Sequence, residues 1–211
     1  MKKYICFLLL NMAVVLGAAA QDMASVFVAM PDENVPQLEN EWRKDLIDLY
    51  HAGKEAKLKN TMDGYSVLKK LTDDYLLLES TGRSSIEMKL LPLVNNTKVI
   101  CVVNTVKGPA PDSRVSFFTT EWEPLDSADL FIPVASEWFL KEDADKNSNA
   151  YREATSLLDI NLVKYTLSPD DQTLTATFTT PLYLGKEERE KVIPFIKETP
   201  KVYTWKKFRF E

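Results

Sequence analysis

The chain has 211 residues, and its 31 Asp and Glu outnumber its 26 Lys and Arg, which gives a formal net charge of −5 at pH 7. An acidic chain is poorly suited to phosphate backbones and anionic membrane surfaces, so the charge argues against nucleic acid as a partner. A single histidine and two cysteines leave little scope for histidine-based catalysis or for a cysteine framework.

Residues 1–20 have the three parts of a secretory signal peptide. Lys2 and Lys3 precede an apolar run over 5–16, and small residues at 17–20 form an A-x-A-type cleavage site. A membrane anchor is the competing interpretation, but a span needs about 20 apolar residues. Position 21 is Gln rather than Cys, so a lipoprotein anchor is not expected. The sequence predicts an exported product, periplasmic or extracellular, with neither a membrane span nor a lipid anchor.

Cleavage after Ala20 would leave 191 residues, with 24 basic and 31 acidic side chains and a formal charge of −7. Cys101 would be the one cysteine left, so no internal disulfide could form. It lies in the run 99–103, which is apolar on both faces. We therefore expect a buried thiol in a central strand.

In chain order, residues 21–33 are expected to be a short lead-in. Asn34 and Gln37, with Pro36 between them, resemble a capping box that opens a helix ending near Gly53. Apolar residues at helical spacing from Val35 to Tyr50 support this helix.

The pattern then changes to short extended runs separated by turn residues, which predicts an antiparallel meander. The expected strands cover 65–71, 75–81, 86–91, 98–106 and 114–119.

The second half alternates between helical and extended patterns. We expect a helix from Pro133 through Phe139 and a short helix around Tyr151 to Leu158. A hairpin of strands 161–167 and 173–180 follows, then a helix over 186–193 and a last strand over 202–210.

The elements define an α+β fold, in which an antiparallel β-meander sheet has helices packed on one face. Residues 1–20 form the signal peptide, 21–125 the first helix and meander, and 126–211 the remaining helices, hairpin and final strand. The two halves either complete one globular unit or form two related helix–sheet subdomains.

No motif announces an activity. Nucleophile elbows, P-loops, dinucleotide fingerprints and H-E-x-x-H are absent from the sequence, and His51 fits a cation at a helix C-terminus. Paired carboxylates at 45/48, 73/74 and 170/171 could serve a glycosidase, but the last two pairs fall where turns are expected. No cofactor and no catalytic residue is predicted.

The run 143–149 carries the oxygen side chains of a weak calcium candidate. Asp143, Asp145 and Asn147 occupy positions 1, 3 and 5 of such a loop. Position 6 is Ser148 instead of Gly, and position 12 is Ala154 instead of Glu. Helix capping by Asp145, Asn147 or Ser148 is the alternative.

The final strand carries a candidate binding face. With strict alternation, Tyr203, Trp205, Lys207 and Arg209 share one side, a mixture of aromatic and cationic groups that suits a sugar or a protein partner. Burial of Tyr203 and Trp205 in a core is the competing interpretation.

Several segments resemble a family of uncharacterised secreted Bacteroidetes proteins, known only as a domain of unknown function. They are RKDLID at 43–48, LTDDYL at 71–76, MKLLP at 88–92, CVVNTV at 101–106, GPAPDS at 108–113, TTEW at 119–122 and PL at 124–125. The resemblance implies export and assigns no activity. The run Asp126-Ser127-Ala128 also resembles the short O-glycosylation signal of such bacteria, so Ser127 is a candidate for modification.

The leading hypothesis is a non-enzymatic, exported binding or interaction module of the cell envelope, whose partner is an envelope protein or a glycan. A carboxylate-dependent hydrolase acting on glycans is the alternative, and an inhibitor-like fold is a third.

Overall fold

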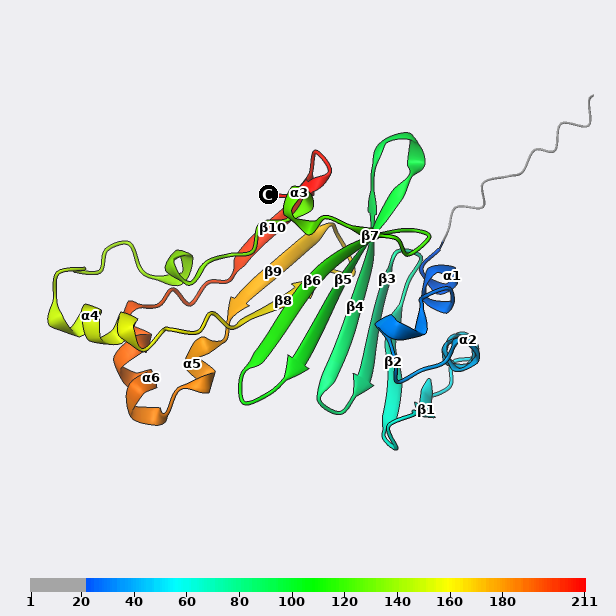
Figure 1. Cartoon of the computed structure of the whole chain (residues 1–211), viewed down its shortest axis with the longest axis horizontal. Helices are drawn as coiled ribbons and strands as arrows, with labels where there is room; N and C mark the ends of the chain where they lie inside the picture. Colours follow the sequence, from blue (N-terminus) through cyan, green and yellow to red (C-terminus); the bar gives the residue numbers. More distant parts are fainter. Residues whose placement is uncertain (1–21) are drawn as a thin grey trace, which may run out of the picture.

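A computed structural model describes residues 22–211, so the predicted signal peptide lies outside the described residues. Two antiparallel sheets dominate the fold (Figure 1). The first has seven strands in sequence order: β1 (Lys57–Lys59), β2 (Tyr65–Leu71), β3 (Tyr75–Thr81), β4 (Ser84–Pro92), β5 (Lys98–Lys107), β6 (Pro111–Thr119) and β7 (Pro124–Leu125). The second has the order β11-β10-β9-β8, from β8 (Val163–Leu167), β9 (Thr173–Phe178), β10 (Lys201–Lys206) and β11 (Arg209–Phe210). The predicted α+β class and the predicted meander are confirmed.

Helices and short 3-10 turns surround the sheets. The helices are α1 (Met23–Val28), α2 (Asn40–His51), α3 (Ser127–Leu130), α4 (Asn149–Ser156), α5 (Thr180–Tyr183) and α6 (Lys186–Val192). The 3-10 turns are η1 (Asp32–Asn34), η2 (Val94–Asn96), η3 (Ser136–Phe139) and η4 (Ile193–Phe195). In Figure 1, α1 and α2 lie beside β2 and β3, whereas α4, α5 and α6 gather at the far end of the second sheet.

Both faces of the seven-stranded sheet are covered. Successive side chains along β5 enter two different hydrophobic cores. Ile100 and Val102 of β5 belong to the core beneath α1 and α2. Cys101 and Val103 belong to the core shared with the second sheet. The burial predicted for Cys101 is confirmed, since its side chain is fully enclosed. Desolvation also raises the pKa of this thiol, so it is held in its unreactive protonated form.

Side chains of the first sheet cover the free edge of the second sheet. The outward backbone N–H groups of β8 are bound in turn by three oxygens: Val163 N by Asp112 Oδ1 at 3.1 Å, Tyr165 N by Ser113 Oγ at 3.0 Å, and Leu167 N by Glu87 Oε2 at 2.8 Å. An unpaired strand edge otherwise invites pairing with another chain. These bonds therefore protect the edge and join the two sheets.

Helix α2, which corresponds to the first helix predicted from the sequence, starts at a different residue from the predicted one. It begins at Asn40 instead of Asn34, and its N-cap, Glu39, makes no side-chain capping bond. The predicted capping box is therefore wrong. The physical reason is Arg43, whose buried guanidinium donates hydrogen bonds to the carbonyl oxygens of Met30 and Leu38. These bonds hold the chain before the helix in an irregular conformation.

Among the short helices and strands, the sequence prediction missed α1, α3, α5, β1 and β7. The expected lead-in contains α1, which is capped by Asp22, whose Oδ1 accepts a 2.8 Å bond from Ser25 N. Its Met23, Val26 and Phe27 are buried in the core between the helices and the first sheet. The cap and the apolar residues were visible in the sequence, so this helix could have been predicted.

Two predictions in the second half are also corrected. The helix expected from Pro133 is only the 3-10 turn η3, because the side chains of Tyr165 and Asn161 bind the N–H and the carbonyl of Val134 and keep that residue extended. The last strand is not continuous, since Lys207 and Phe208 adopt φ of 50° and 65° and reverse the chain. Two successive positive φ values are typical of a tight hairpin turn.

Candidate functional site

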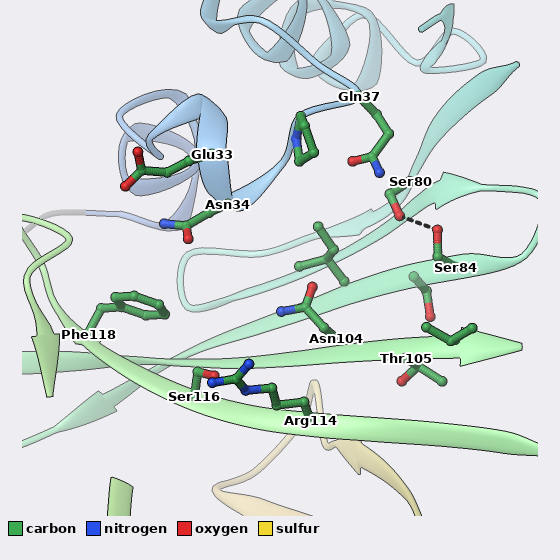
Figure 2. Close-up of a pocket in the computed structure, with 14 residues that line it drawn as sticks. Glu33, Asn34, Gln37, Ser80, Ser84, Asn104, Thr105, Arg114, Ser116 and Phe118 are labelled. Carbon is green, nitrogen blue, oxygen red and sulfur yellow. Dashed lines mark hydrogen bonds between the residues drawn. The ribbon is translucent and has the colours of Figure 1, made fainter. Parts of the chain in front are cut away.

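A groove opens on the face of the first sheet that packs against α1 and α2. It lies next to the part of this face that the two helices cover. It encloses about 400 Å³, within the range of about 300–1,000 Å³ that is usual for small-ligand sites. One wall is the segment 33–37, and the floor is formed by β3, β4, β5 and β6 (Figure 2). The lining residues are Glu33, Asn34, Pro36, Gln37, Ser80, Ser84, Ser85, Ile86, Asn104, Thr105, Val106, Arg114, Ser116 and Phe118.

Strand register places the polar floor. Ile86 of β4 lies opposite Asn104 of β5, and Asn104 lies opposite Arg114 of β6. Ser116 and Phe118 follow Arg114 at two-residue steps, so all three side chains leave β6 on the same face. Asn104 and Arg114 are exposed. The floor therefore presents an amide, a guanidinium and a hydroxyl in adjacent positions, with the Phe118 ring at one end (Figure 2).

The wall at 33–37 is held in place from both sides. Arg43 binds the carbonyl oxygen of Leu38 at 2.7 Å and Asp32 Oδ1 at 2.8 Å. From the other side, Thr61 Oγ1 donates to the carbonyl of Pro36 at 2.8 Å and Thr61 N donates to that of Gln37 at 3.1 Å. The groove is consequently preformed rather than dependent on a loop that must close.

Polar side chains of the groove have unused hydrogen-bonding capacity. Within residues 22–211, seven of them make no side-chain hydrogen bond and no ion pair: Glu33, Asn34, Gln37, Ser85, Asn104, Arg114 and Ser116. By contrast, Ser80 and Ser84 bond to each other at 2.8 Å (Figure 2). The groove can therefore offer donors and acceptors of both charge signs to a polar ligand.

The four residues of the predicted binding face, Tyr203, Trp205, Lys207 and Arg209, do not form one continuous surface. Trp205 is buried against Phe117 and Phe210, and its Nε1 donates to the carbonyl of Pro92 at 3.0 Å. Tyr203 is also buried, and Lys207 lies in the hairpin turn. The expected alternation beyond Lys206 is wrong, because the turn brings Phe210 opposite Trp205. Tyr203 and Arg209 do line one pocket together, on the second sheet.

The calcium candidates Asp143, Asp145 and Asn147 form a turn that leads into α4. The Asp145 carboxylate accepts a 3.0 Å bond from Asn147 N, and Ser148 caps the helix by accepting 3.1 Å from Tyr151 N. Among residues 22–211, no group of three or more His, Cys, Asp or Glu side chains is arranged to hold a metal ion.

Other candidates lie in ordinary places. Ser127 is half-buried in the first turn of α3, and its glycosylation stays a prediction. Asp73 and Asp74 lie between β2 and β3, and Asp170 and Asp171 lie between β8 and β9, so the predicted turns are confirmed. No helix in the described part of the chain is long and apolar enough to span a bilayer.

Sequence reasoning missed the groove. Asn104, Arg114 and Ser116 are polar residues on strands, and such residues are ordinarily solvent-facing. The signal that distinguishes them is the wall opposite, which exists only because the segment 33–37 is drawn across the sheet by Arg43 and Thr61.

The fold and the groove define an α+β protein with two packed antiparallel sheets and a preformed polar groove beside its N-terminal helices. The chain belongs to a family described as a protein of unknown function (DUF3256), whose sequence model matches residues 15–210. The family resemblance seen in the sequence is therefore confirmed.

A similar solved structure comes from a Bacteroidetes bacterium. It is the structure of a domain of an uncharacterized protein from Porphyromonas gingivalis W83, 29% identical in sequence, with a TM-score of 0.79. The match covers 89% of this chain and 96% of that one. No curated protein matches this chain.

Proposed function

We propose that this chain is an exported, non-enzymatic binding protein of the cell envelope that takes a glycan into the groove. The observation that carries the proposal is the convergence there of seven polar side chains without protein partners. Sugars are recognised by amides, hydroxyls and charged groups that bind their hydroxyls, together with an aromatic ring against their apolar face. Asn34, Gln37, Asn104 and Arg114 supply the first kind of group, and Phe118 supplies the second.

The hydrolase alternative has less support from the same groove. A glycosidase needs two carboxyl groups on either side of the scissile bond, about 5–9.5 Å apart. Of the groove's lining residues, Glu33 is the one carboxylate. Binding without turnover is therefore the function that these residues favour.

We expect Arg114→Ala to weaken glycan binding about tenfold, since it removes charge-assisted hydrogen bonds from the β6 side of the floor. Asn104→Ala, its cross-strand neighbour, should have a similar effect. Isothermal titration of the mature protein against glycan and peptidoglycan-fragment panels measures both variants. The matched control is Arg83→Ala, an exposed arginine on the β3–β4 turn outside the groove, which should bind as the unmodified protein does.

The proposal fails if no glycan of either panel binds, or if Arg114→Ala and Arg83→Ala bind alike. Release of free sugar during the titration, abolished by Glu33→Gln, would support the hydrolase instead.

Export makes a separate prediction. Expressed with its full N-terminus in a Gram-negative host, the protein should be recovered from the periplasm or the medium with Gln21 as its first residue. Intact-mass spectrometry checks this, because loss of residues 1–20 and absence of lipid fix one mass. A product that retains Met1, or carries an acyl chain, would contradict the predicted processing.

A further inference from the structure

A second pocket lies on the other sheet and shares no lining residue with the groove. It encloses about 440 Å³ between the segment 132–135 and the β10–β11 hairpin. Its lining includes Ile132, Trp138, Lys201, Tyr203, Arg209 and Glu211.

The wall at 132–135 is apolar and fixed. The Tyr203 hydroxyl donates to the carbonyl of Ile132 at 3.1 Å, and Val134 N donates to the Tyr165 hydroxyl at 3.2 Å. Asn161 Nδ2 completes the anchoring with a 3.0 Å bond to the carbonyl of Val134. Although its backbone is tied down, the Ile132 side chain is 61% exposed. The pocket therefore offers a rigid apolar surface that the protein itself leaves uncovered.

Two cations face this wall. Lys201 Nζ lies 4.5 Å from the Tyr203 ring centroid and 5.7 Å from that of Trp138, so cation–π contacts hold it over the rings. It has no carboxylate partner among the described residues.

Arg209 has more unused capacity. Its guanidinium makes no hydrogen bond within residues 22–211, and its Nε is buried without one. Its one ion pair is with Glu211 Oε1, at 4.0 Å, between side chains that are 39% and 47% exposed. Exposed ion pairs of this kind contribute little to stability, so Glu211 is a weak competitor for the guanidinium.

We infer that this pocket binds a small organic carboxylate with an apolar body. A guanidinium presents parallel N–H groups that match a planar carboxylate, and Lys201 adds a second positive charge beside it. The apolar body then lies on the wall that carries Ile132. A neutral ligand would leave Lys201 without a carboxylate and Arg209 with only its weak pair to Glu211. A bare inorganic anion would leave the apolar wall uncovered.

The test uses the mature protein, phenylacetate as the probe, and phenylacetamide and inorganic phosphate as matched comparisons. We expect phenylacetate to bind at least about tenfold more tightly than either comparison, measured by titration calorimetry or ligand-observed NMR. Equal binding of the acid and the amide, or tighter binding of phosphate, would overturn the inference, as would no binding of phenylacetate.

Two variants should change the affinity in opposite directions. Arg209→Gln should weaken phenylacetate binding about tenfold, whereas Glu211→Gln should strengthen it about threefold by removing the competing carboxylate. Lys206→Gln, an exposed lysine on β10 outside the pocket, is the control and should leave the affinity unchanged. Because Arg209 makes no hydrogen bond within residues 22–211, its replacement should leave the thermal midpoint nearly unchanged.

An unchanged affinity in Arg209→Gln would exclude this site. Glycan binding in the groove, measured on the same samples, distinguishes failure here from failure of the proposed function, since the two sites share no residue.

Discussion

Replacing Arg43 by methionine is expected to destabilise the folded protein by about 3–5 kcal/mol, because it removes one buried side chain that satisfies several backbone carbonyls. Arg43 is 1% exposed. Its guanidinium donates to the carbonyls of Leu38 at 2.7 Å, Val28 at 3.2 Å and Met30, and it pairs with Asp32 at 2.8 Å. Methionine fills similar space but donates nothing, so the carbonyls of Leu38 and Met30 lose their partner in a buried site.

Urea unfolding followed by circular dichroism measures the loss. Lys44→Met is the matched control, because Lys44 lies next along α2 but is exposed, and a change there should stay within about 0.5 kcal/mol. Arg43→Lys should fall between the two, since an ammonium keeps the charge but cannot span the same acceptors. The account of Arg43 would be wrong if Arg43→Met unfolded at the same urea concentration as Lys44→Met.

The same side chain explains which parts of the fold were predictable. Strands β2 and β3 match their expected limits, because alternation and turn residues are local signals. The start of α2 was not predictable, because it depends on a guanidinium binding carbonyls up to fifteen residues earlier in the chain. The residue spacing around Asn34 and Gln37 does not indicate that Arg43 binds these carbonyls.

The hairpin at β10–β11 shows a second limit. Positive φ at two successive residues is usually signalled by Gly or Asn, and here the residues are Lys207 and Phe208. Packing decides the conformation instead, since the turn places Phe210 against Trp205 and Phe117. After this reversal, Arg209 and Tyr203 line one pocket.

The groove and the pocket arise from contacts between segments distant in sequence, and the same holds for the attachment of the second sheet. The predicted hairpin of this sheet is present as β8 and β9, and Leu174 and Ala176 of β9 are buried. No local pattern indicated that Glu87 on β4 would bind the backbone of β8, 80 residues away.

Glu87→Leu is therefore expected to destabilise the protein by about 3 kcal/mol. Glu87 is 5% exposed, and its Oε2 accepts from Leu167 N at 2.8 Å and from the Tyr75 hydroxyl at 3.4 Å. Leucine accepts neither bond, and an unsatisfied buried N–H costs about 1–3 kcal/mol, to which the tyrosine hydroxyl adds. Glu87→Gln is the matched control, since its amide oxygen can accept both bonds without carrying a charge.

The two variants should also separate by pH. Desolvation raises the pKa of the Glu87 carboxyl above its ordinary value of 4.5, although the bond from Leu167 and the charge of Lys164 oppose the shift. A carboxyl whose pKa is higher in the folded state contributes most to stability below its unfolded pKa, and this contribution declines as the pH rises toward the folded pKa. Glutamine does not titrate, so Glu87→Gln should gain stability relative to the unmodified protein as the pH rises above about 4.5.

Urea unfolding of all three proteins across a pH series measures both effects. If the difference between Glu87→Gln and the unmodified protein stays constant with pH, Glu87 is not a desolvated carboxylate. If Glu87→Leu is as stable as the unmodified protein, the bond to Leu167 does not hold the second sheet. Loss of stability in Glu87→Leu alone, with a pH-dependent gain in Glu87→Gln, would show that the acceptor joins the sheets while its charge opposes folding.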